Sequence, residues 1–174
     1  MNQTKAALTI FIFLILLTLF QAAYYYPQMP EKVASSFNAQ GEANGWMDKA
    51  GFMIFQIGLT LFLCATFLGV AFGMNYIPVS LVNLPNRDYW FAPERRKETL
   101  DFLKREMLWF SNATLVFMLA VFQLTYKANL EQESKLDNFF WLYMGLYLLY
   151  SIWWTVHFYR RFSKKNMEAA GGLN

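Results

Sequence analysis

Four long apolar runs divide the chain, and its charged residues are confined to the segments between them. A helix needs about 20 predominantly apolar residues to cross a bilayer core, and each run is close to that length. The pattern therefore predicts an all-α integral membrane protein that forms a single membrane domain over residues 1–174. Its four transmembrane helices are expected at about 6–26, 51–77, 108–126 and 139–159.

Composition supports this class and excludes others. Of the 174 residues, 56% are hydrophobic and 20% are aromatic, which is too apolar for a soluble domain of this size. The net charge of +3 comes from Lys and Arg near the ends of the runs, so no nucleic-acid partner is expected. The only cysteine, Cys64, lies within the second run, which excludes an intramolecular disulfide and a cysteine-based metal site.

The distribution of basic residues predicts how the chain sits in the membrane. Eleven Lys and Arg, including Lys164 and Lys165, fall on the side of the two termini and residues 79–106, against four on the other side. Because cytoplasmic loops carry the excess of Lys and Arg, both termini should be cytoplasmic. The polar loop between the first two helices then faces outward.

This outer loop, Pro27–Trp46, has the composition of a structured connection. Two prolines, two glycines and two asparagines favour defined turns, and Trp46 is expected to anchor the return to the membrane. A calcium site built on the loop's Asp, Glu and Asn oxygens is the alternative, but their spacing does not fit the alternation of a calcium loop. No metal is therefore predicted.

Two rows of residues on the second helix have helical spacing. Ala65, Gly69 and Gly73 repeat a small residue every fourth position, which predicts a packing face for another helix, either in the same chain or in a second copy. A second row can hydrogen-bond a neighbouring helix, and this polar contact is favoured over the lining of a pathway. It consists of Gln56, Thr60 and Cys64.

The charged segment before the third helix predicts an amphipathic cytoplasmic helix. Pro93 suits a first helical position, and Leu100, Leu103, Met107 and Phe110 fall on one face. We expect this helix to lie on the membrane surface before the chain turns inward, with the preceding aromatic residues Tyr89, Trp90 and Phe91 dipping into the headgroups. Contact with anionic lipid or a cytoplasmic partner is assigned to Arg95, Arg96 and Lys97.

No catalytic residues are predicted, and the protein is interpreted as non-enzymatic. The four runs contain no Asp, Glu, Lys or Arg, which argues against an ion-coupled transporter. One stripe on the last helix could form a haem or quinone pocket, but a packing seam is favoured because no other histidine can supply a second haem ligand, and no cofactor is predicted. The stripe consists of Tyr143, Tyr147, Tyr150, Trp154 and His157.

The outer loop resembles the DUF1648 family, whose domain also occurs at the N-terminus of SdpI-type toxin-immunity proteins. The matching residues are Met29–Val33, Phe37–Glu42 and Asn44–Trp46, within a similar region of about 8–75; Ser36 stands where the family usually has histidine. The resemblance implies a multi-pass protein of the bacterial cytoplasmic (inner) membrane with an outward loop. For the better understood members it also implies protection against, or sensing of, a membrane-active peptide toxin.

These observations predict an accessory, immunity-like or sensing protein that recognises something outside the cell. Besides the lipid bilayer, its expected partner is another membrane protein or a second copy of the chain. The alternatives are a cofactor-binding small subunit of a membrane redox complex and a transporter of a neutral solute. The predicted recognition surface consists of Pro30, Asn38, Gly41, Gly45 and Trp46.

Overall fold

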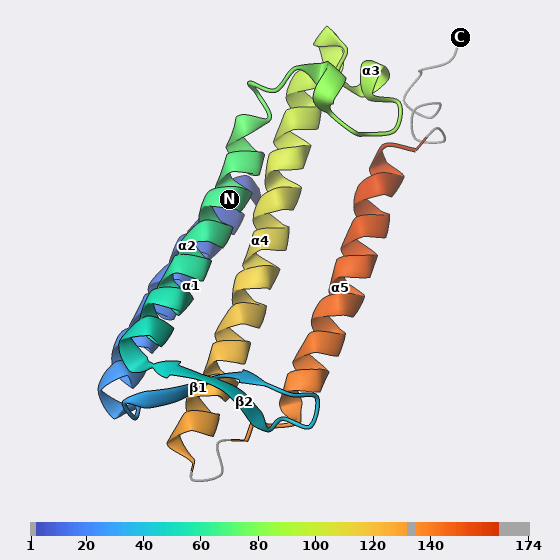
Figure 1. The fold of residues 1–174 in the computed structure, drawn as a ribbon. Helices are drawn as coiled ribbons and strands as arrows, with labels where there is room; N and C mark the ends of the chain where they lie inside the picture. The colour runs from blue at the N-terminus through green and yellow to red at the C-terminus, as the bar shows by residue number, and fades with distance from the viewer. Residues whose placement is uncertain (1–2, 132–134, 164–174) are drawn as a thin grey trace.

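Four long helices and one β-hairpin make up the fold, seen in the computed structural model of the chain (Figure 1), which describes residues 3–131 and 135–163. All four helices are long and apolar enough to cross a membrane, which confirms the prediction of four helices of this length and composition. Lys164, Lys165 and the rest of the C-terminal tail lie outside the described residues. The helices are α1 (Gln3–Tyr25), α2 (Lys49–Gly73), α4 (Pro93–Leu130) and α5 (Phe139–Arg161).

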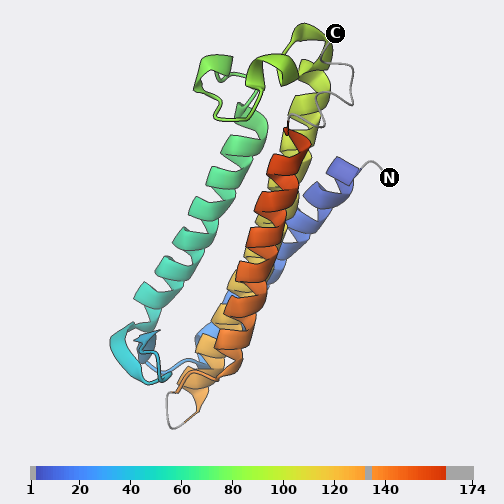
Figure 2. The ribbon, with the colours of Figure 1, turned by 90° about the vertical axis from the view of Figure 1, so that its right-hand side faces the viewer.

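The hairpin corrects the all-α prediction. Strands β1 (Lys32–Phe37) and β2 (Ala43–Asp48) pair antiparallel and cross one end of the bundle, which we call the hairpin end (Figures 1 and 2). The turn-forming residues of the loop had predicted turns, and the two short strands were not expected. The register of their pairing shifts around Ser35 and Ser36. The opposite end of the bundle holds the N-terminal part of α4 and the C-terminus of α5, and we call it the basic end.

Helix α4 is the centre of the bundle, because α1, α2 and α5 all pack against it. It has 38 residues and is therefore about 57 Å long, well beyond the roughly 30 Å of a bilayer core. The prediction of a separate helix lying on the membrane surface is wrong: residues 93–106 continue the third span without a break. No Gly or Pro follows Pro93 within α4, so nothing interrupts the hydrogen-bond ladder.

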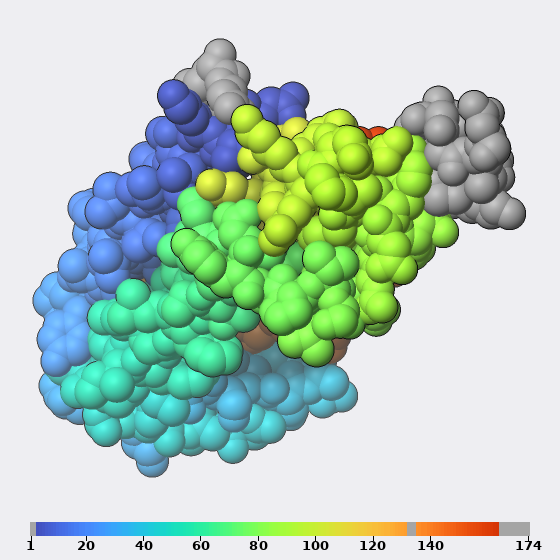
Figure 3. All heavy atoms as spheres, turned by 90° about the horizontal axis from the view of Figure 1, so that it is seen from above, coloured from blue at the N-terminus to red at the C-terminus, as the bar shows by residue number. Residues whose placement is uncertain are grey.

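At the basic end, the connection between α2 and α4 folds into a cap that includes a 3₁₀ turn (Val79–Leu81) and the short helix α3 (Arg87–Trp90). Seen from above (Figure 3), this connection forms the green to yellow-green part of the surface. Trp90 and Phe91 are buried here, so the prediction that they dip into the headgroups is wrong. They pack in one cluster with Val82, Phe102, Leu103, Phe158 and Phe162.

Helix α2 turns its polar row inward and its small residues outward. Gln56, Thr60 and Cys64 are buried, and the Tyr126 hydroxyl of α4 donates a hydrogen bond to Gln56 Oε1, which confirms the predicted polar contact between helices. No atom of the described residues lies within 4 Å of a methyl group placed on Gly69 or Gly73. At these two glycines the predicted small-residue face has no packing partner among the described residues. Packing against a second copy of the chain remains a prediction.

Candidate functional site

The hairpin has one face in the core and one face in solvent. Val33 is fully buried, and it packs with Met47 of β2 against a cluster that includes Phe52 and Tyr126. On the other face, Trp46 is 46% exposed, and the Lys32 ammonium lies 5.8 Å from the centre of its ring. The packing of the inner face in the core thus holds the hairpin in an orientation that exposes Trp46 and Lys32.

A single buried side chain of α4 holds β1. Asn129 Oδ1 accepts a hydrogen bond from Ala34 N at 2.6 Å, and Asn129 Nδ2 donates to Ala34 O at 3.0 Å and to Thr125 O at 2.9 Å. Ala34 is fully buried and Asn129 is 7% exposed. The amide therefore takes the place of a neighbouring strand and satisfies backbone groups that no water reaches.

The tip of the hairpin is shaped by Asn38 and Gly41. Asn38 Oδ1 accepts from the backbone N–H groups of Gln40 and Glu42, and Asn38 Nδ2 donates to the Glu42 carboxylate at 2.9 Å. Gly41 has a φ of 80°, a left-handed conformation that favours glycine. Its carbonyl accepts from Leu136 N at 2.8 Å, which ties the tip to the chain just before α5.

Gly45 has a different role, because it lies opposite Ser36 in the strand pairing. A methyl group on Gly45 would overlap the Ser36 hydroxyl, which donates to Asn44 Oδ1 at 2.7 Å. Gly45 thus leaves room for the Ser36 side chain. In this chain that space holds a small hydroxyl group.

The structure brings the five predicted recognition residues onto one hairpin, but it gives them unequal roles. Asn38 and Gly41 shape the tip, Gly45 makes room beside β1, and Pro30 is exposed where the chain enters the hairpin. Of the five, only Trp46 presents a large side chain at the centre of the solvent-exposed face of the hairpin, which we call the outer face. Two residues of this site were not predicted from the sequence: Lys32, which lies beside Trp46, and Asn129, which holds β1 and which we call the clamp residue. The one signal for Asn129 was an amide side chain just past the end of an apolar run.

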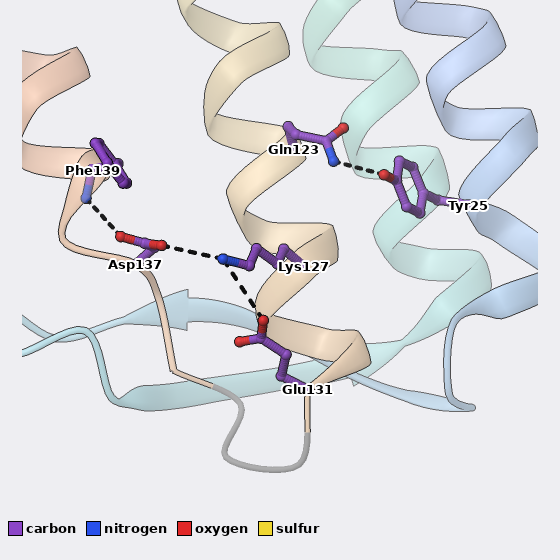
Figure 4. A network of polar contacts seen from close by, with 6 residues as sticks. All are labelled: Tyr25, Gln123, Lys127, Glu131, Asp137 and Phe139. Carbon is purple, nitrogen blue, oxygen red and sulfur yellow. Dashed lines mark hydrogen bonds and ion pairs between the residues drawn. The ribbon is translucent and has the colours of Figure 1, made fainter.

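A polar network braces the turn between α4 and α5 beside the hairpin (Figure 4). Lys127 Nζ pairs with Asp137 at 3.3 Å and with Glu131 at 3.8 Å, and Asp137 Oδ1 accepts from Phe139 N at 3.0 Å. The hydrogen bond from this backbone N–H, aided by Lys127, holds the pKa of Asp137 below its usual range. From the position before the N-cap residue Asn138, the carboxylate therefore satisfies one free N–H group at the start of α5, and we call this contact the cap.

Acidification should weaken this cap. Because the pKa of Asp137 is lowered on folding, its contribution to stability is present above about pH 4, the ordinary range of an Asp, and is lost as the pH falls through the native pKa. The thermal midpoint of Asp137→Asn should lie below that of the unchanged protein at pH 7, and the gap should close toward pH 3. A gap that does not change with pH would contradict this role.

The aromatic stripe of α5 is a packing seam against α4 over most of its length. Tyr147 stacks on Phe117 with ring centres 4.6 Å apart and shares a hydrogen bond with Thr114 Oγ1, and Trp154 lies 4.5 Å from the Phe110 ring. His157 is separate from this seam: it is exposed at the basic end and stacks on Trp153. The favoured interpretation of the stripe is thus the one the geometry supports.

The three basic residues assigned to lipid or partner contact lie on the first turns of α4, where Arg96 and Lys97 line one hollow and Arg95 lies apart from them. The Arg95 guanidinium stacks on Tyr89 at 4.1 Å, whereas Arg96 Nη2 donates to the Asn75 carbonyl at 3.3 Å. Lys97 is exposed and lines a cleft shared with α5. Among the described residues, no group of three or more His, Cys, Asp or Glu could hold a metal ion.

Residues 13–61, which include most of α1, the whole hairpin and the first half of α2, match the family described as a domain of unknown function, DUF1648. This segment of the chain is therefore similar to the DUF1648 domain. The match centres on the hairpin and its two flanking helices, so the DUF1648 segment holds the shaped loop, while the clamp residue Asn129 lies outside it. No curated protein and no solved structure matches the chain.

Proposed function

We propose that this DUF1648 protein is a non-enzymatic recognition protein of the bacterial cytoplasmic membrane, with an immunity-like or sensing role. The hairpin is the recognition element and faces outward, and both termini are cytoplasmic. The excess of Lys and Arg at the basic end supports this orientation. The ligand is a membrane-active peptide or the outer part of another membrane protein, which would contact the exposed face around Trp46.

The observation that carries the proposal is the way the hairpin is held. Asn129 fixes β1 from α4, Leu136 fixes the tip, and Val33 seals the inner face into the core. A two-stranded hairpin alone is at best marginally stable in water, so these attachments are what give it a fixed shape. A surface that is ordered before binding loses less entropy on binding, which suits recognition.

The outer face also has the chemistry of a binding surface. An exposed tryptophan next to a lysine offers a large apolar area together with a charge, and tryptophan is enriched among residues that dominate binding energy. Inside, the first turns of α4 would contact anionic lipid or a cytoplasmic partner through exposed Arg96 and Lys97.

The test separates the exposed face from the fold of the hairpin. Trp46→Ala removes the exposed ring. The amount of partner recovered by crosslinking in native membranes should then fall by about tenfold or more. Ala39→Ser is a control, because Ala39 is exposed at the tip and away from Trp46. Both variants should insert and fold as the unchanged protein does. If Trp46→Ala captures partners as well as the control does, the outer face is not the recognition surface.

A further inference from the structure

A cleft opens between α4 and α5 at the basic end. It has a volume of about 790 Å³, and its walls come from the first turns of α4 and the last turns of α5. The charge-free part of α4 begins at Met107, so Arg105 lies just outside the hydrocarbon and the cleft is at headgroup depth. The cleft is lined by Glu94, Lys97, Glu98, Asp101, Phe102, Arg105, His157, Arg160 and Arg161.

The charges in this cleft are ordered by depth. Arg105 is closest to the hydrocarbon, with His157 of α5 at the same end, and Asp101 follows one turn farther out along α4. Arg105 forms an ion pair with Glu106 through Nε, at 3.4 Å, and its guanidinium lies 5.2 Å from the centre of the Phe102 ring. Its terminal nitrogens make no hydrogen bond within the described part of the chain. Asp101 forms no ion pair with any described residue, whereas Glu98 is neutralised by Arg161 at 2.6 Å.

A second, apolar groove lies farther along the same two helices, toward the hairpin end. It has a volume of about 500 Å³ and runs between Ala113 and Ala120 of α4 and the facing rings of Tyr143 and Tyr150 of α5. Arg105, Trp109, Ala113, Val116 and Ala120 are spaced four, four, three and four residues apart, which places them along one flank of α4.

The matching flank of α5 shows that cleft and groove lie on the same side of the helix pair. Leu146, Tyr150, Trp153, His157 and Arg160 are spaced four, three, four and three residues apart. Trp109 and Trp153 lie between the two hollows, and both are exposed, as tryptophans at a membrane interface are. A charged cleft at headgroup depth and an apolar groove below it thus lie on one side of the helix pair, where a lipid headgroup and an acyl chain could each find a place.

We propose that this cleft and groove together bind one phospholipid with a zwitterionic amino headgroup, of the phosphatidylethanolamine type. The phosphate would contact Arg105 and His157, and the ammonium would contact Asp101. The two-carbon ethanolamine arm spans about one helical turn, which is the offset between Arg105 and Asp101. An anionic headgroup would satisfy the arginine but would face the unpaired acid, and a quaternary ammonium could not donate hydrogen bonds to it.

Lipid titration followed by native mass spectrometry tests the site on the intact, delipidated protein. Ethanolamine, glycerol and choline phospholipids with identical acyl chains would be compared for the first bound lipid. The ethanolamine lipid should bind about tenfold more tightly than the other two, the range of one charge-assisted hydrogen bond. Equal binding of the three, or tighter binding of the glycerol lipid, would overturn the proposal.

Two variants assign the roles. Asp101→Asn should reduce binding of the ethanolamine lipid to the level of the choline lipid and leave the choline lipid unchanged, whereas Arg105→Gln should weaken all three. Asp88→Asn and Lys5→Gln make the same charge changes at the basic end outside the cleft and should have no effect. If Asp101→Asn still binds the ethanolamine lipid more tightly than the other two lipids, Asp101 does not contact the ammonium group and the proposal fails. The site is independent of the function proposed for the hairpin.

Discussion

Replacing Asn129 with leucine should release the hairpin from α4 while leaving the four helices in place. The change removes both hydrogen bonds to Ala34 and leaves that residue's N–H and carbonyl buried without partners. Each buried group left without a partner costs about 1–3 kcal/mol, so the free energy of opening the hairpin should fall by about 2–6 kcal/mol.

Amide hydrogen exchange measures this opening directly. Exchange of the amides in Lys32–Asp48 should accelerate by about 30-fold or more, since local opening sets the rate. Exchange in the middle of α2 should not change. Asn138→Leu is the matched control, because Asn138 is exposed near the same end and its side chain does not cap α5. Hairpin exchange equal to that of the control would show that Asn129 is not the clamp.

Replacing Gly41 with alanine should have the second large effect, on the tip of the hairpin. A Cβ at this position would lie 2.6 Å from the Leu136 carbonyl oxygen, and the φ of 80° is itself unfavourable for alanine. The left-handed conformation alone costs about 1–2 kcal/mol. Because the clashing atom belongs to the backbone, the chain before α5 must move, and the bond from Leu136 N to Gly41 O should break.

The same substitution at two other glycines separates strain from the loss of a glycine. In Gly45→Ala the only atom closer than an ordinary contact is the Ser36 hydroxyl oxygen, which can rotate away. The cost in stability should therefore be clearly smaller than that of Gly41→Ala. Gly58→Ala in α2 meets nothing within 4 Å and should leave the thermal midpoint unchanged or raise it. From highest to lowest, the expected order of thermal midpoints is Gly58→Ala, Gly45→Ala and Gly41→Ala. Equal decreases of the thermal midpoint for Gly41→Ala and Gly45→Ala would contradict it.

The candidate site was only partly predictable. The turn chemistry of Asn38 and Gly41 pointed to a shaped loop, because such residues have strong local backbone preferences. The sequence did not indicate that this loop forms two strands, since their apolar positions do not alternate over a long enough stretch. It also could not separate residues that shape the hairpin, such as Gly45, from one that is displayed, such as Trp46.

The sequence by itself determined the four helices and the segregation of charge between the two ends. Both follow from local composition, because an apolar run of sufficient length favours a membrane helix whatever the rest of the chain does. Only the tertiary structure decided which face of α2 turns inward, since lipid is as apolar as a helix surface and only specific packing and polar contacts choose the face. The tertiary structure also decided that α4 continues beyond the third span and that Asn129, 95 residues from Ala34, fixes the hairpin. Contacts between such distant residues depend on how whole helices pack, and no local pattern encodes them.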